Sequence, residues 1–115
     1  MKIKEFVANY DLHDSLVEKV EHYNEKLIMS IILCNWRQKN YNSLDDEMKP
    51  VKLIFNNVTD VVVDPSNVVF DSDTILEFKY SNKKMNSDSV DIELVIEGEG
   101  DIKIINFKSD MVEVL

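Results

Sequence analysis

The sequence predicts a single, mainly β domain of six to eight antiparallel strands in meander order, packed as a sandwich or barrel. Apolar and acidic residues alternate from Ile75 to Leu115, and alternation of period two is typical of half-buried strands. The 115-residue chain also has the length of one domain and a globular composition, with 44% hydrophobic and 30% charged residues. We therefore expect residues 1–115 to form one domain.

The second half of the chain gives the clearest strands. One is expected over 74–80 and another over 90–97, separated by a polar loop at 81–88. Both glycines follow, and a hairpin turn is expected there because glycine accepts positive φ. Ile102, Ile104 and Phe107 are expected to carry the returning strand, and residues 111–115 a last short one. The inward positions predicted on the first two strands are Leu76, Phe78, Val90, Ile92, Leu94 and Ile96.

The middle of the chain is less regular. Strands are expected over 51–55 and 58–63, with a bulge or tight turn at Asn56-Asn57 between them. A turn is predicted at 64–67, followed by a short strand or one helical turn at 68–70. The polar residues 37–50 are expected to form a long exposed loop.

Residues 14–36 support two interpretations. Apolar residues at 12, 16, 20, 23, 27 and 31 have helical spacing, and a helix over 15–36 would make the fold α+β. However, residues 27–33 are branched and apolar on nearly all sides, as in a central strand. Asn24-Glu25-Lys26 stands where a hairpin turn would fall, which favours a hairpin.

The net charge of −9 is concentrated in the second half of the chain. Residues 58–115 hold thirteen Asp and Glu against five Lys, a net of −8. Such a surface argues against nucleic acid and anionic membranes, which need basic residues. It suits solubility or a basic partner protein reached under electrostatic steering. We expect a cytoplasmic protein, because the chain has one cysteine, no signal peptide and no run long enough to span a membrane.

No motif in the sequence predicts a cofactor, a metal or catalysis. The four aspartates at 60, 64, 71 and 73 lack the calcium-loop pattern, and the two histidines do not have zinc spacing. The single Cys34 is expected to be a buried hydrophobe. His13-Asp14 is the pair most suggestive of chemistry, but no nucleophile accompanies it in a recognisable arrangement, so we expect a structural role in a turn.

An acidic face is the better candidate for a binding surface. If the predicted inward positions are correct, Glu77, Asp91, Glu93 and Glu97 point outward together. Lys79 and Lys103 are expected to neutralise part of this charge across strands. Trp36, near a predicted loop, is a candidate anchor for a protein contact, although a core position is the ordinary expectation for tryptophan.

The stretch 12–64 resembles small bacterial β domains that include the immunity proteins encoded beside polymorphic toxins. The resemblance is carried by Leu12-His13-Asp14-Ser15, by the apolar run 27–33 ending at Trp36, and by the segment 53–60. It implies a hairpin at 14–36 and a binding role rather than catalysis.

The leading hypothesis is therefore a non-enzymatic protein-binding domain, an immunity-type inhibitor that presents an acidic face to a basic protein. The second hypothesis is a structural module that forms homo-oligomers through exposed strand edges and has no dedicated ligand. The third is a hydrolase that uses His13 and Asp14.

Overall fold

Eight antiparallel strands follow one short helix in the computed structural model, which describes residues 1–82 and 88–115. Residues 83–87, in the expected loop at 81–88, lie outside the described residues. The elements are α1 (Ile3–Asn9), β1 (Leu16–Tyr23), β2 (Lys26–Cys34), the 3₁₀ turn η1 (Asn35–Arg37), β3 (Met48–Asn56), β4 (Thr59–Asp64), β5 (Asp73–Ser81), β6 (Val90–Gly98), β7 (Asp101–Ser109) and β8 (Met111–Val114).

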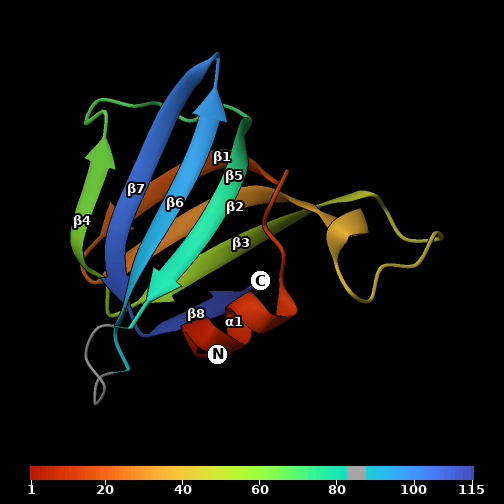
Figure 1. Ribbon diagram of the computed structural model, residues 1–115, viewed down its shortest axis with the longest axis horizontal. Coiled ribbons are helices and arrows are strands. Elements are labelled where there is room, and N and C mark those ends of the chain that lie inside the picture. The colour runs from red at the N-terminus through yellow and green to blue at the C-terminus, as the bar shows by residue number, and fades with distance from the viewer. Residues whose placement is uncertain (83–87) are drawn as a thin grey trace.

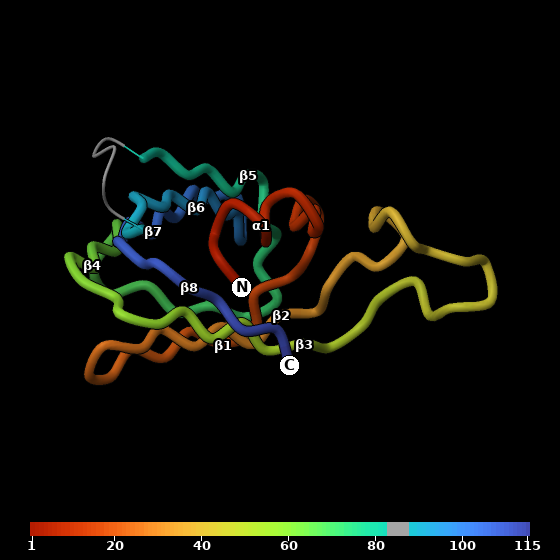
Figure 2. Tube along the Cα trace, turned by 90° about the horizontal axis from the view of Figure 1, so that it is seen from below, coloured from red at the N-terminus to blue at the C-terminus, as the bar shows by residue number. Residues whose placement is uncertain are grey.

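The strands form one open sheet in the order β4-β7-β6-β5-β1-β2-β3-β8. This confirms the mainly β, antiparallel fold. β1 and β5 share only the register pairs Leu16–Thr74 and Val17–Asp73. The sheet folds over near this narrow junction, so that β4 to β7 form one layer and β1 to β3 form the other (Figures 1 and 2). The result is sandwich-like, with the core between the two layers.

Residues 14–36 form a hairpin, and the helical alternative is wrong. β1 and β2 pair along their length, and the turn between them has Asn24 at φ 54°. Four alternate residues of β2 face the core, namely Leu27, Met29, Ile31 and Leu33. The outward residues Ile28 and Ile32 are only partly exposed, because they pair with Ile54 and Pro50 of the neighbouring β3.

The inward face of β7 differs from the expected one. Ile102 is 50% exposed, whereas Ile105 and Phe107 are buried. The register explains the difference: Ile105 pairs with Leu94, so it shares the inner face, while Ile104 pairs with Val95 on the outer face. Both alternations fit the sequence of this strand, and only the pairing decides between them.

β5 departs from simple alternation at a bulge. The register slips between Ile75 and Glu77, which leaves Leu76 as the extra residue. Ile75 and Phe78 therefore both turn toward the core, and Leu76 is only partly buried, contrary to its expected inward position. The four inward positions predicted for β6 are confirmed, because Val90, Ile92, Leu94 and Ile96 are all buried.

The link at Asn56-Asn57 carries the chain from one layer to the other. Asn57 has φ 52°, as expected for a tight turn, but β3 pairs with β2 and β8 while β4 pairs with β7.

Residues 68–70 form neither a strand nor a helix. The expected loop at 37–50 is shorter, because β3 begins at Met48, and the 3₁₀ turn η1 precedes it. The final short strand is confirmed as β8.

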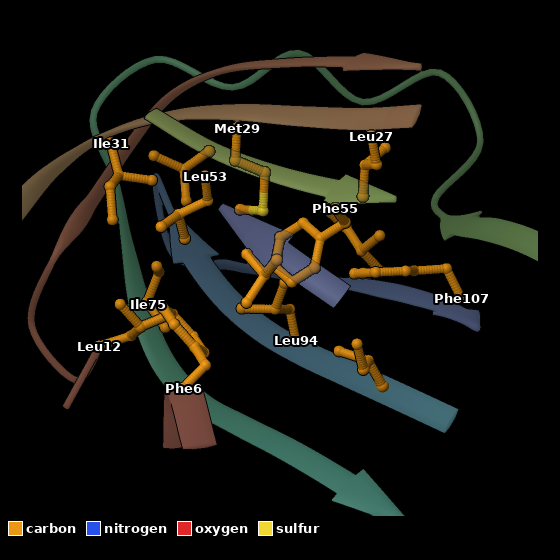
Figure 3. Packing of buried hydrophobic residues seen from close by; sticks show 14 of the residues in the cluster. Phe6, Leu12, Leu27, Met29, Ile31, Leu53, Phe55, Ile75, Leu94 and Phe107 are labelled. Atoms are coloured by element: carbon orange, nitrogen blue, oxygen red, sulfur yellow. The ribbon is translucent and has the colours of Figure 1, made fainter. Parts of the chain in front are cut away.

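α1 completes the core, although the sequence analysis did not predict it. Its Phe6 is fully buried and stacks on Tyr10 at a ring separation of 5.2 Å. The same ring meets Phe78 edge-on at 5.6 Å and Phe55 at 6.5 Å. Figure 3 shows Phe6 pointing into the buried cluster from the helix side. Tertiary packing, rather than helix propensity, therefore holds this seven-residue helix in place.

A buried ion pair ties the first residues of β5 and β7 to the loop that precedes β5. The Lys103 ammonium contacts the Asp73 carboxylate, with side chains only 13% and 5% exposed, and donates a further hydrogen bond to the carbonyl of Val69 at 2.9 Å. Gly98 lies against this carboxylate, and a Cβ there would collide with it. Gly98 is thus explained by close approach, whereas Gly100, at φ 81°, serves the expected turn.

Candidate functional site

His13, Asp14 and Arg37 form a cluster of charged side chains where the chain enters β1. Asp14 has φ 68° in a turn, and this geometry brings neighbouring side chains to the same side. Its two carboxylate oxygens are divided between two partners: Arg37 Nε donates to one at 3.0 Å, and His13 Nδ1 lies 3.1 Å from the other. His13 and Asp14 are therefore in contact, which a regular strand would not allow.

The cluster is braced by hydrogen bonds to the backbone. Gln38 donates to the carbonyls of Asp11 and Cys34 at 2.7 and 2.9 Å, and its side-chain oxygen accepts the Asp11 N–H at 3.0 Å. The buried Ser15 hydroxyl accepts the Cys34 N–H at 2.8 Å. These bonds fasten the loop after β2 to the turn before β1.

Electrostatic interactions and burial in the cluster favour the charged form of the Asp14 carboxylate and the neutral form of the Cys34 thiol. Burial raises the pKa of Asp14, but hydrogen bonds from Arg37 and His13 outweigh this effect and lower the pKa overall. Burial, with the Asp14 charge second, raises the pKa of the Cys34 thiol. Cys34 is 1% exposed, which confirms that it is a buried hydrophobe.

Replacing Arg37 with glutamine should raise the pKa of Asp14 toward its ordinary value of about 3.9. A carboxylate whose pKa is lower in the folded state stabilises the fold above its unfolded pKa, and this stabilisation is lost as pH falls through the folded pKa. The variant should therefore begin to lose stability at a higher pH than the wild type. Carboxyl ¹³C NMR titration of Asp14 and acid unfolding would measure both effects. An unchanged Asp14 titration would contradict the assigned role of Arg37.

The four predicted acidic residues occupy the outer face of β5 and β6. Glu93 pairs with Lys79, while Glu77 pairs with Val95, and neither row contains a buried core residue. Asp91 and Glu97 belong to neighbouring rows of the same face. We call Glu77, Asp91, Glu93 and Glu97 the acidic face. It looks toward the viewer in Figure 1, and neither α1 nor η1 covers it.

Only one of the two expected neutralising lysines lies on the acidic face. Lys79 stands opposite Glu93 in the register, and its ammonium lies 3.3 Å from Glu77 of its own strand, so it neutralises part of this charge. Lys103 shares the inner face with Ile96 and is used by Asp73, so it does not neutralise the acidic face. This expectation for Lys103 is wrong because the alternation of β7 is opposite to the predicted one.

Apolar side chains interrupt the acidic face. The register places Val95 beside Ile104, and Ile102 beside Glu97. Val62 of β4 joins them at the edge of the layer, with 58% exposure. An uncovered sheet face that mixes exposed aliphatic residues with carboxylates is suited to contact with another macromolecule.

Trp36 lies apart from these strands, on η1. Its ring is 49% exposed, so the ordinary expectation of a core tryptophan is wrong, and the Arg37 guanidinium carbon lies 5.2 Å from the ring centroid. The loop that follows extends well beyond the layers (Figures 1 and 2). Leu44 in this loop is 92% exposed. The structure therefore does not bring Trp36 together with the acidic face.

The aspartates considered for calcium are dispersed. Asp73 is used by Lys103, and Asp60 lies 3.3 Å from the Lys108 ammonium. Across residues 1–82 and 88–115, no three His, Cys, Asp or Glu side chains gather as metal ligands would. No helix in the described part of the chain has the length and apolar character needed to cross a membrane.

The chain matches no protein-family model, no curated protein and no solved structure.

Proposed function

We propose that this domain is a non-enzymatic binding protein that meets a basic partner protein through its acidic face, in the manner of an immunity-type inhibitor. One observation carries the proposal: the outer side of β5 and β6 gathers four carboxylates on a sheet face that α1 and η1 leave uncovered, namely those of Glu77, Asp91, Glu93 and Glu97. The resemblance over residues 12–64 supports the inhibitor role and suggests that the partner is encoded in an adjacent gene.

The composition of the face suits this role. Carboxylates at the rim speed the approach of a positively charged protein and select against acidic ones. The aliphatic residues between them, Val95, Ile102 and Ile104, supply apolar area that is removed from water when the partner docks. The carboxylates thus set the selectivity for a basic partner, and the buried apolar area slows its dissociation.

The hydrolase alternative has less support. Both oxygens of Asp14 are engaged, one by Arg37 and one by His13. The nearest hydroxyl along the chain, that of Ser15, is fully buried and accepts the Cys34 N–H. The contacts of this cluster are those of a loop brace.

The paired substitution Glu93→Lys and Glu97→Lys should weaken partner binding by at least about tenfold, because each places a like charge against a basic surface. The measurement is calorimetric titration with the purified product of the gene next to that of this chain. Wild-type affinity should also fall as the ionic strength is raised well above about 0.15 M.

The matched control is Glu21→Lys with Glu113→Lys, which makes the same charge change on the outer side of β1 and β8. These residues lie in one register row of the opposite layer, through Ile28 and Ile54. The control should bind within about twofold of the wild type. Equal losses from both pairs, or no complex with either neighbouring gene product, would overturn the proposal.

A further inference from the structure

We propose that the groove between α1 and β5 binds one lysine or arginine side chain of the basic partner. This inference rests on the proposed function, because it assigns a specific pocket to part of that partner. The α1–β5 groove has a volume of about 330 Å³. Its lining residues are Phe6, Val7, Tyr10, Asp11, Leu12, His13, Leu76, Glu77 and Phe78.

The walls of the groove are mainly apolar and aromatic. The partly exposed rings of Tyr10 and Phe78 line the groove, and the fully buried Phe6 packs against both, stacked on Tyr10 and edge-on to Phe78. Figure 2 shows α1 close to β5. The long aliphatic stem of a lysine or arginine packs against such a wall, and its cationic head is attracted to aromatic faces within about 6 Å.

Two carboxylates border the groove, those of Asp11 and Glu77. Asp11 accepts the backbone N–H of His13 at 2.9 Å through Oδ1, which fixes the side chain, and its Oδ2 lies 3.5 Å from an Arg37 nitrogen. Glu77 lies 3.3 Å from the Lys79 ammonium. Both acidic side chains are about half exposed, at 48% and 54%, and exposed ion pairs of this kind contribute little. Asp11 Oδ2 and the Glu77 carboxylate can therefore exchange these ion pairs for a charge-assisted hydrogen bond to an incoming cation.

The chemistry of the lining selects among ligands. An anion would be repelled by Asp11 and Glu77. A neutral apolar group would remove water from the carboxylates without offering a donor, which is unfavourable. A guanidinium or ammonium group can donate hydrogen bonds to the carboxylates, while its aliphatic stem packs against the apolar wall.

The position of the groove connects it to the acidic face. Glu77 belongs to both, because it borders the groove and pairs with Val95 in the outer row. The register of β1 with β5 ends at Thr74, so α1 rather than a strand lies beside the following part of β5. A partner that covers the acidic face can thus place one basic side chain in the groove.

The test uses capped amino acids as probes for the full-length chain. Acetyl-arginine amide and acetyl-lysine amide are titrated while ¹H–¹⁵N and aromatic ¹H–¹³C spectra are recorded. Acetyl-citrulline amide, which is nearly isosteric with the arginine probe but uncharged, is the ligand control. The cationic probes should produce saturable shifts at the Phe6, Tyr10 and Phe78 rings and at the Glu77 amide, and the citrulline probe should not.

Glu77→Gln should weaken binding of the arginine probe by about tenfold, since it removes a charged acceptor. Glu21→Gln makes the same change on the outer side of β1, outside both the groove and the acidic face, and should alter affinity by less than about twofold. Equal shifts with citrulline, or an unchanged affinity for Glu77→Gln, would overturn the groove assignment. If the arginine probe leaves the groove residues unshifted while the Glu93→Lys and Glu97→Lys pair still abolishes partner binding, the groove assignment fails and the proposed function stands.

Discussion

Replacing Lys103 with methionine should lower the free energy of unfolding by about 3 kcal/mol. Methionine retains most of the aliphatic volume but leaves the Asp73 carboxylate, which is 5% exposed, without its cation. Breaking a buried ion pair from one side typically costs about 3–5 kcal/mol, and the lower end applies because Lys103 keeps 13% exposure. The hydrogen bond to the Val69 carbonyl is also lost. Urea unfolding followed by fluorescence would measure the change.

The double variant Lys103→Met with Asp73→Asn separates charge burial from packing. It should recover part of the loss, because it removes the uncompensated charge but not the missing donor. Lys79→Met is the matched control. Lys79 is 54% exposed and paired with the equally exposed Glu77, so its replacement should change stability by less than about 1 kcal/mol. A Lys103→Met variant as stable as the control would show that the buried pair contributes nothing.

The local alternation of apolar and polar residues predicts much of this fold, because every second residue of a half-buried strand faces the core and is apolar. It identified β6 with all four inward positions, and the choice of a hairpin over a helix at 14–36 is confirmed by the pairing of β1 with β2. The acidic face follows from the same alternation, since the outward residues of β5 and β6 are its carboxylates. For these elements each residue's environment is set by neighbours close along the chain.

The features that the sequence did not predict depend on distant partners. The sequence of β7 allows either Ile102 and Ile104 or Ile105 to face the core. Pairing with β6 selects the second arrangement, which buries Lys103 against Asp73. A turn at His13-Asp14 is expected from the sequence, but the contact of Asp14 with both His13 and the distant Arg37 depends on its left-handed backbone and on the fold. The α1–β5 groove brings together segments about 65 residues apart, so no local pattern indicates it.

Replacing Phe6 with alanine should lower the free energy of unfolding by about 3–5 kcal/mol, the usual cost of deleting a buried phenylalanine. The ring is fully buried and contacts three other aromatic rings, those of Tyr10, Phe55 and Phe78. Because α1 has only seven residues, the cavity should also detach the helix, whose isolated turns are not stable in water. Urea unfolding and amide hydrogen exchange along residues 3–9 would measure the two effects.

Tyr23→Ala provides the aromatic control for this variant. Tyr23 is 52% exposed at the end of β1, so its removal should cost less than about 1 kcal/mol and leave exchange in α1 unchanged. If Phe6→Ala loses stability while residues 3–9 stay protected, tertiary packing is not what holds the helix. If the helix detaches as expected, one wall of the groove is removed, and the arginine probe should lose its binding even though Asp11 and Glu77 are both retained. That result would separate the aromatic contribution to cation binding from the contribution of the carboxylates.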